Sequence, residues 1–545
     1  MKSDMTDSIC ATATPVGNGG ISVIRLSGPR AVEIAEKVVR CRRGSLADLP
    51  SHRVKFVEFV AEEAGDSAFA GAAASGEVLD EGVVTLFRAP HSYTGEDVVE
   101  LSCHASPYIV RRLLSALTAA GARMAEPGEF TKRAFLNGRM DLSQAEAVAD
   151  LIAAENKASH DLAWRQLRGG VSNEMAALRA RLVEFASLVE LELDFSEEDV
   201  EFADRSALRT LLDEIAVRVA ALRRSFATGL ALKEGVPVVL IGRPNAGKST
   251  LLNRLLHEEK ALVSEIPGTT RDTIEDVWEW EGIRYRFIDT AGLRESADPL
   301  ELAGMARTKE KMRRSRLWLY LFDASEMSAE AARAEASRWY RDVMGGGDAA
   351  AGVSPSAPVG SPEIGSPELQ ILLVGNKCDK LAASSLANAV GGESGASDVT
   401  YLSASGNIDD SQGVAVADGV SEIAASGLKH TSVGLSGAAG GTLDLLYLSA
   451  KTGQGMDVLE SRIKARCGLR LSENETILTN ARHAEVLGRL AETLDRILSG
   501  LTANLSGDLL AQDIREALRY IGEITGEVHP DELLGTIFGR FCIGK

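Results

Sequence analysis

The chain has 545 residues, of which 45% are hydrophobic, and this length allows about three or four domains with cores of their own. Its formal net charge is −19, which excludes a general electrostatic attraction to nucleic acid, so any RNA contact must use a local basic patch.

Cysteine spacing and the lack of long apolar runs favour a cytoplasmic protein. The N-terminus lacks the apolar core of a signal peptide, and the longest apolar run, Leu317–Phe322, is far too short to span a bilayer. We therefore expect a soluble protein without a membrane partner. A zinc site or a disulfide framework is not expected, because no C-x-x-C spacing occurs among Cys10, Cys41, Cys103, Cys378, Cys467 and Cys542.

Residues 1–138 have the pattern of a mixed α+β domain. Alternating apolar residues predict strands at Ile21–Arg25, Val83–Phe87 and Asp97–Cys103. Helical spacing predicts a helix at Ala31–Val39.

Residues 139–234 have helical periodicity almost throughout. Helices are predicted at Ser143–Asn156, Met175–Leu193 and Arg205–Leu232. The acidic stretch Glu190–Glu201 is interpreted as a solvated face or loop, the usual role of a charge run.

A phosphate-binding loop pattern, G-x-x-x-x-G-K-[ST], runs from Gly242 to Ser249. An apolar, β-branched strand is predicted before it, at Val236–Ile241, and a helix after it, from Leu251. In this position the backbone N–H groups and the helix N-terminus favour phosphate. Lys248 reaches the outer phosphates, and the Ser249 hydroxyl can ligate magnesium.

A second nucleotide motif follows the predicted strand Arg284–Ile288. Its aspartate, Asp289, is expected to hold magnesium through water, and its glycine, Gly292, to sense the γ-phosphate. The full motif is Asp289, Thr290, Ala291 and Gly292.

The base is read by a third motif, at the carboxyl end of the predicted strand Ile371–Val374. The carboxylate of Asp379 can accept from both the ring N–H and the exocyclic amine of guanine, whereas adenine has no such donor pair. A further strand, Leu445–Leu448, leads to a loop that contacts the base from the other side. The two loops are Asn376, Lys377, Cys378 and Asp379, and Ser449, Ala450 and Lys451. GTP is therefore the expected nucleotide.

The nucleotide module covers residues 235–467 and contains two low-complexity insertions, 345–367 and 382–441. Both are rich in Gly, Ser and Ala, and we expect them to be loosely ordered. Residues 468–545 are helical again, with helices predicted at Ser472–Thr502 and Leu509–Ile524. The nucleotide module is thus expected to be inserted within a helical domain.

Five motifs outside the nucleotide module are more specific than the nucleotide motifs. They are Ala13–Gly20, Tyr93–Glu100, Glu126–Phe130, Phe135–Leu142 and the terminal Phe541–Lys545. With these motifs the chain resembles the MnmE (TrmE) family of tRNA-modification GTPases over almost its whole length. The resemblance implies a multidomain α/β and α fold. An α+β folate-binding and dimerisation domain precedes a discontinuous helical domain, which contains an inserted Ras-like P-loop G domain and ends in the C-I-G-K motif.

The same resemblance implies partners and a reaction. The protein would form a homodimer, and a heterotetramer with an FAD-dependent MnmG (GidA) family protein. With that partner it would add a carboxymethylaminomethyl-type group to C5 of the wobble uridine of certain tRNAs. A folate of the 5-formyltetrahydrofolate type would be held by Arg25, Glu100, Arg139 and Lys545, and position 139 is lysine in some relatives.

Hydrolysis needs a group that the usual pattern does not supply. Leu293 follows the motif at Asp289 and cannot orient water, and no arginine finger is evident. The resemblance assigns water positioning to Glu301, with an exposed helix glutamate as the alternative interpretation. It assigns potassium, in place of the finger, to Asn245, Ser264, Ile266 and Thr269, and the magnesium shell to Ser249 and Thr270. The remaining GTP contacts would come from Ala246, Gly247, Thr250, Glu265, Pro267 and Gly268.

Three other reactive side chains are considered. Cys542, between Phe541 and Ile543, is interpreted as a small packed apolar side chain, with a nucleophile as the alternative. His104 and His483 have no carboxylate or cysteine at metal-ligand spacing, so neither is assigned as a ligand.

Two other functions use similar motifs. A ribosome-assembly GTPase acting as a binding switch would carry the same nucleotide loops, but not the N-terminal and C-terminal motifs. A folate-dependent one-carbon enzyme would use the G module only as a structural or regulatory part.

Overall fold

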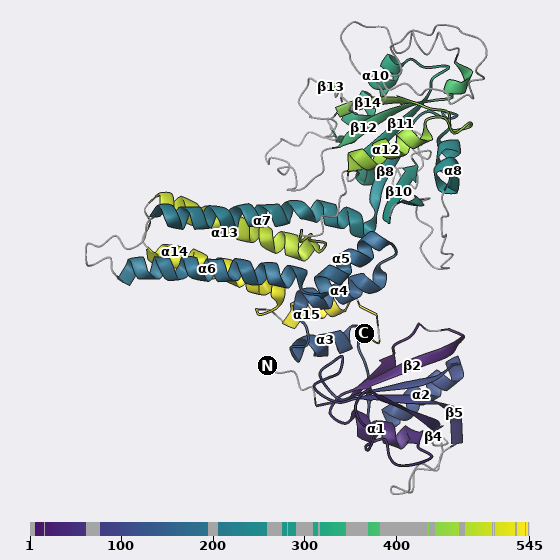
Figure 1. Cartoon of the computed structure of the whole chain (residues 1–545), viewed down its shortest axis with the longest axis vertical. Helices are drawn as coiled ribbons and strands as arrows, with labels where there is room; N and C mark the ends of the chain where they lie inside the picture. The colour runs from purple at the N-terminus through teal and green to yellow at the C-terminus, as the bar shows by residue number, and fades with distance from the viewer. Residues whose placement is uncertain are drawn as a thin grey trace, which may run out of the picture. The chain divides into compact units, whose positions relative to one another are not determined.

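The computed structural model forms two compact units, which are described separately (Figure 1). The first comprises residues 1–153, 163–219 and 485–545, and the second comprises residues 154–162 and 220–484. The structure describes residues 6–15, 17–61, 77–194, 205–258, 275–280, 282–289, 309–313, 315, 317–344, 369–381, 433–434, 442–467, 475–503, 505, 507–528, 531–539, 541–542 and 544.

A seven-stranded sheet forms the core of the N-terminal part, in the order β3-β4-β5-β6-β2-β1-β7. Only the β1–β7 pair is parallel. The strands are β1 (Ile9–Thr12), β2 (Gly19–Ser27), β3 (Val39–Arg40), β4 (Arg53–Ala61), β5 (Glu77–Phe87), β6 (Val98–Ala105) and β7 (Arg123–Met124). The three strands predicted in this region are confirmed within β2, β5 and β6, except that β6 begins at Val98, one residue after the predicted start. The predicted helix is confirmed except for its last residue, which begins β3.

The two faces of this sheet differ. Ile24 and Leu26 of β2 are buried against α1 (Ala31–Val38) and α2 (Pro107–Ala119). Because successive side chains of a strand point to opposite faces, Arg25 lies on the other face. The helix α3 (Glu129–Leu136) contributes Phe130 to a small cluster with Ile9.

The helical part of the first unit contains long helices, and the predicted helices other than the one at Ser472 begin and end within five residues of observed ones. α6 and α14 lie side by side (Figure 1). The helices are α4 (Leu142–Ala153), α5 (Lys157–Leu167), α6 (Gly170–Asp194), α7 (Arg205–Glu234), α13 (Ala481–Thr502), α14 (Gly507–Thr525) and α15 (Asp531–Phe538), of which α5, α7 and α13 continue into the second unit.

The prediction that a helix begins at Ser472 is wrong. Residues 475–480 have no helical structure, and α13 begins at Ala481. The Asn480 side chain accepts a hydrogen bond from the backbone N–H of Arg482 at 2.9 Å, which caps the helix at this point.

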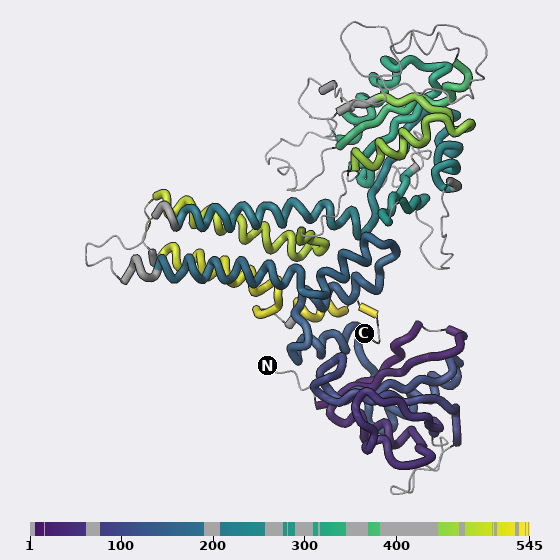
Figure 2. The backbone as a smooth tube through the Cα atoms, viewed as in Figure 1, coloured from purple at the N-terminus to yellow at the C-terminus, as the bar shows by residue number. Residues whose placement is uncertain are grey.

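The second unit is built on a seven-stranded sheet in the order β13-β14-β12-β11-β8-β10-β9, with only the edge strands β9 and β13 antiparallel. The backbone passes from α7 through Gly235 into β8 (Figure 2). The strands are β8 (Val236–Ile241), β9 (Glu275–Trp280), β10 (Ile283–Asp289), β11 (Leu317–Asp323), β12 (Gln370–Asn376), β13 (Val433–Gly434) and β14 (Thr442–Tyr447).

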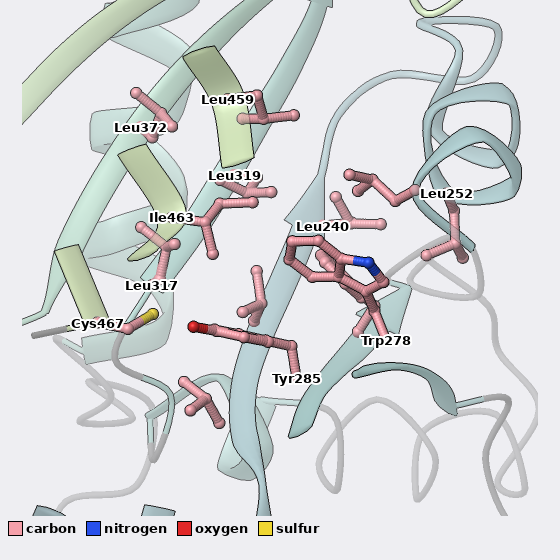
Figure 3. Close-up of a cluster of buried hydrophobic side chains, with 14 of the residues drawn as sticks. Leu240, Leu252, Trp278, Tyr285, Leu317, Leu319, Leu372, Leu459, Ile463 and Cys467 are labelled. Carbon is pink, nitrogen blue, oxygen red and sulfur yellow. The ribbon is translucent and has the colours of Figure 1, made fainter. Parts of the chain in front are cut away.

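Helices cover both faces of this sheet. On one face, α8 (Lys248–Glu258) and α12 (Met456–Cys467) pack against Leu240 and Leu319, as Figure 3 shows for part of the cluster. On the other face, α10 (Ala329–Met344) packs against Trp318 and other strand residues. The buried parallel strands place the loops at their carboxyl ends along one edge, where α/β sheets bind ligands.

Several expectations fall largely outside the described residues. These are the insertion 345–367, the insertion 382–441 except for the two residues of β13, and most of the acidic stretch 190–201. Within the described ranges, each helix is too short or too polar to span a bilayer.

Candidate functional site

The phosphate-loop motif connects the carboxyl end of β8 with α8, which begins at Lys248, three residues before the predicted start. Two glycines are required by close contacts. A Cβ on Gly242 would lie 2.2 Å from the carbonyl oxygen of Leu321, and one on Gly247 would lie 2.2 Å from Nδ2 of Asn376. Any larger residue would therefore force the loop away from its neighbours.

The polar groups of this loop are at or near the surface. Lys248 is 9% exposed, and its ammonium donates to the carbonyl oxygen of Gly242 at 2.6 Å. Asn245, Ser249 and Thr250 are exposed, and Asn245 has a φ of 66°. The loop thus presents an ammonium, hydroxyls and an amide at a helix N-terminus, a set suited to an anion and a hard cation.

Asn376, the last residue of β12, joins three loops. Its Nδ2 donates to the carbonyl oxygen of Ala246 at 2.9 Å, and its Oδ1 accepts from the backbone N–H of Ala450 at 2.9 Å. The side chain is 3% exposed, so both bonds are shielded from water. The structure thereby brings the phosphate loop together with the two loops predicted to contact the base.

The carboxylate of Asp379 is held from the second of these loops. Ser449 is fully buried, and its hydroxyl donates to Oδ1 of Asp379 at 2.6 Å. Asp379 and Lys451 are exposed, and Ala450 is buried. An exposed carboxylate whose orientation is fixed by a buried hydroxyl can accept two N–H donors from a planar ligand.

One residue of this site was not identified from the sequence. Asp323 ends β11 and accepts a hydrogen bond from the ammonium of Lys377 at 2.6 Å. Burial alone would raise the pKa of the Asp323 carboxyl, but hydrogen bonds from Lys377 and Ser325 outweigh it and lower the pKa. Its position at the carboxyl end of an apolar strand was the available sequence signal.

Other site residues predicted from the sequence cannot be placed. Asp289 is the last residue of β10, and only its backbone is described. The residues outside the described ranges are Ser264, Glu265, Ile266, Pro267, Gly268, Thr269, Thr270, Thr290, Ala291, Gly292, Glu301 and Lys545.

In the N-terminal part, Arg25 and Glu100 are directly opposed on β2 and β6. The Nε and Nη2 of Arg25 donate to Oε1 of Glu100 at 3.0 and 2.9 Å. The guanidinium lies 5.1 Å from the ring centre of Tyr93 and 5.7 Å from that of Phe130. This arrangement combines a partly exposed ion pair with aromatic surfaces.

Arg139 lies close to Gly95, in the loop that contains Tyr93. It is exposed, and its Cγ is 3.3 Å from the position that a Cβ on Gly95 would occupy. The C-terminal segment reaches the same domain, because the backbone N–H of Gly128 donates to the carbonyl oxygen of Cys542 at 3.4 Å.

A network of ion pairs around the buried Arg133 holds the loop that contains Tyr93 and Glu96. Arg133 is 2% exposed, and its guanidinium contacts Asp7 at 2.7 Å, Glu129 at 3.1 Å and Glu96 at 3.2 Å. Burial raises the pKa of the Glu129 carboxyl, but hydrogen bonds from Arg123, the backbone of Glu126 and Arg133 outweigh it and lower the pKa. The network connects Asp7 to Glu96 in the loop and to α3.

The surroundings of two reactive side chains differ from those expected from the sequence. The interpretation of Cys542 as packed is wrong in this chain, because its side chain is exposed. His104 has a carboxylate partner that sequence spacing did not reveal, since its Nδ1 lies 2.8 Å from Oδ1 of Asp80 on the neighbouring strand.

Comparison with known proteins gives matches over nearly the whole chain. A family model described as the MnmE helical domain matches residues 142–542, and one described as the GTP-binding protein TrmE N-terminus matches residues 8–139. The chain is 44% identical over 541 residues to the tRNA modification GTPase MnmE of Cytophaga hutchinsonii, covering 99% of this chain and 98% of that protein. It is 42% identical over 544 residues to the protein of the same name from Christiangramia forsetii, covering 99% of this chain and 100% of the relative.

The chain also resembles a solved GTP-binding protein over part of its length. Era from Aquifex aeolicus overlaps 47% of this chain and 66% of its own, with 19% identity and a TM-score of 0.23. Such a value supports no functional conclusion.

Proposed function

Because the chain belongs to the MnmE (TrmE) family of tRNA modification GTPases, we propose that it hydrolyses GTP in the course of modifying tRNA. The observation that carries this proposal is the position of Asn376, which joins the phosphate loop to the loop of Ser449 and Ala450. One side chain thus couples the part of the site suited to phosphate to the part suited to guanine.

The roles of the described residues follow from their chemistry. Lys248 would contact the outer phosphates, and the exposed hydroxyl of Ser249 would ligate magnesium, which prefers hard oxygen ligands. Asp379, oriented by Ser449, would accept both donors on the edge of guanine. Magnesium, when bound, neutralises the charge that develops on the phosphates.

The proposal assigns the remaining hydrolytic groups from the family resemblance. Glu301 would orient the attacking water, and potassium would occupy a site made by Asn245 with oxygens of Ser264, Ile266 and Thr269. The exposed amide oxygen of Asn245 is a ligand type that fits this ion. Thr270 would complete the magnesium shell.

A folate site at Arg25 and Glu100 is part of the same proposal. A carboxylate can accept the two donors of a pterin edge, and the rings of Tyr93 and Phe130 provide apolar surface for a flat ring system. Arg139 and Lys545 would pair with the carboxylates of a glutamate tail. The folate would supply a one-carbon group for the modification.

The proposed division of the chain follows the sequence: 1–138 for folate and dimerisation, 139–234 and 468–545 for the helical domain, and 235–467 for the G domain. The partner would be an FAD-dependent MnmG family protein in a heterotetramer, and the product a carboxymethylaminomethyl-type group on C5 of the wobble uridine. Family matches to both 8–139 and 142–542 favour this function over a ribosome-assembly switch.

The test is mass spectrometry of tRNA nucleosides from cells that lack this protein. We expect the C5-modified wobble uridine to disappear and to return with the unaltered gene but not with Lys248→Ala. Unchanged wobble uridines in the deletion strain would contradict the proposal. Restoration by a Lys248→Ala protein that binds folate would instead favour a one-carbon enzyme with a structural G module.

A further inference from the structure

The carboxylate of Asp323 is held by three hydrogen bonds. Its Oδ2 accepts from the ammonium of Lys377 at 2.6 Å, and its Oδ1 accepts from the backbone N–H of Ser325 at 3.0 Å and from the Ser325 hydroxyl at 2.6 Å. Asp323 is only 9% exposed. Its charge is therefore fixed in one place at the carboxyl end of β11.

Lys377 is fixed at both ends. Its backbone has the left-handed φ of 63°, directly after the buried Asn376, and its ammonium is bound to Asp323. The side chain is nevertheless 27% exposed. Since Lys377 is two residues from Asp379, its methylene stem belongs to the loop that would receive the base, and it offers apolar surface to a flat ring.

We propose that Asp323 is a positioning residue for guanine-nucleotide binding, which acts by holding Lys377 in an ordered conformation before the nucleotide arrives. The inference rests on the proposed function, because it assumes that the loop of Asn376 and Asp379 receives the base.

The physical reason is the conformational freedom of lysine. A free lysine side chain loses rotamer entropy when a ligand packs against it, and this loss weakens binding. With Asp323 in place, that ordering has already occurred in the free protein. The nucleotide then dissociates more slowly. Lys377 stays bound to Asp323 when the nucleotide leaves, so the loop gains little conformational entropy from dissociation.

A purely structural role is less well supported. β11 and β12 are already paired residue by residue from Leu317 to Asp323, so the ion pair is not needed to align the two strands. The Lys377 side chain is also 27% exposed, and an ion pair with one partly exposed partner contributes less to stability than a fully buried one.

The test is a double-mutant cycle on the full-length protein. The dissociation rate of fluorescently labelled GDP is measured for the unaltered protein, Asp323→Asn, Lys377→Met and the double variant. Asp323→Asn keeps the shape of the side chain, and Lys377→Met keeps an apolar stem without the ammonium. Ser325→Ala is the matched control, because it removes the hydroxyl hydrogen bond to the same carboxylate but leaves the backbone N–H bond and the ion pair intact.

We expect Asp323→Asn to accelerate GDP dissociation by about three- to tenfold, the range for one immobilised flexible side chain. The double variant should be no faster than the faster single variant, because both changes remove one interaction. Ser325→Ala should stay within about twofold of the unaltered protein, and the melting temperature of the nucleotide-free Asp323→Asn protein should match that of the unaltered protein, because this change leaves no buried charge without a partner.

An unchanged GDP dissociation rate in Asp323→Asn, or additive effects in the double variant, would overturn the inference. The proposed function would still stand in that case, provided that the unaltered protein binds GDP. A lowered melting temperature with additive effects would assign Asp323 a structural role. Failure of the unaltered protein to bind GDP would overturn both.

Discussion

The side-chain nitrogen of Asn376 lies 2.9 Å from the carbonyl oxygen of Ala246 and donates a hydrogen bond to it, across 130 positions of the sequence. A carboxylate has the same shape but cannot donate. We expect Asn376→Asp to lose this bond and to place a charge against the carbonyl, at a cost of about 1–3 kcal/mol or more. Calorimetric titration with GDP should show an affinity at least about fivefold weaker.

The control for this variant is Arg243→Gln, which removes an exposed ion pair between the phosphate loop and Glu335. It should bind GDP with an affinity close to that of the unaltered protein. Equal affinity of Asn376→Asp and the control would show that the connection between the loops does not support binding.

A second prediction concerns the acid stability of the N-terminal part. The pKa values of the Asp7 and Glu129 carboxyls are lowered. Burial alone would raise them, but the hydrogen bonds from Arg123 and Arg133 outweigh this effect. The folded carboxyls therefore bind fewer protons than the unfolded ones. The contribution of these carboxyls to the free energy of unfolding is fully present above the unfolded pKa values, which are about 4. It is lost as the pH falls through the folded pKa values.

We expect Arg133→Met to reduce the free energy of unfolding by about 1.5–3 kcal/mol at neutral pH, because Glu96 loses its cation and Asp7 and Glu129 keep only Arg123. Urea unfolding followed by circular dichroism from pH 7 to pH 3 should show the difference from the unaltered protein becoming smaller. Arg30→Met, which removes an exposed pair with Glu33, is the control and should have little effect. A constant difference across the range would contradict the assignment.

The sequence predicted a strand or helix well where its pattern of apolar residues is long. β8 was predicted with its observed ends because its apolar run is uninterrupted, and β11 was indicated by the run Leu317–Phe322. β3 and β7 have two residues each, too few to show an alternating pattern. The start of α13 was missed because the apolar Ile477 and Leu478, which are buried without being helical, precede the cap at Asn480.

The site was predictable where function follows a local motif, and not where it depends on long-range contacts. The phosphate loop and the loop ending at Asp379 are continuous in sequence. Asp323 is 54 positions from Lys377, and Arg133 is 126 positions from Asp7, so only the folded chain shows that they are paired. Exposure of Cys542 is likewise a property of the folded chain.

A third prediction is a dependence of hydrolysis on potassium. With Leu293 after the motif at Asp289 and no evident arginine finger, the charge developing on the phosphates needs another stabiliser. We expect turnover at least about tenfold faster in potassium than in sodium buffer. Asn245→Ala should abolish this difference. Equal rates in the two salts for the unaltered protein would contradict the mechanism without affecting the GTP assignment.

Glu301→Ala should separate ion binding from water positioning. If Glu301 orients the water, the variant should lose most GTP hydrolysis. It should retain the potassium-dependent association of two G domains that a transition-state mimic promotes. Size-exclusion chromatography with GDP and aluminium fluoride, in each salt, measures the association. Loss of association together with hydrolysis would show that Glu301 contributes to the ion site.

The central claim is that the joined loops form a guanine-nucleotide site, and Asp379→Asn tests it most directly. The affinities of GDP, ADP and xanthosine diphosphate are measured for the unaltered protein and the variant. We predict that the unaltered protein prefers GDP, and that Asp379→Asn weakens GDP binding by about 1.5–3 kcal/mol and gains affinity for xanthosine diphosphate, whose C2 carbonyl oxygen can accept from the new amide. An unchanged preference for GDP in the variant would contradict the claim.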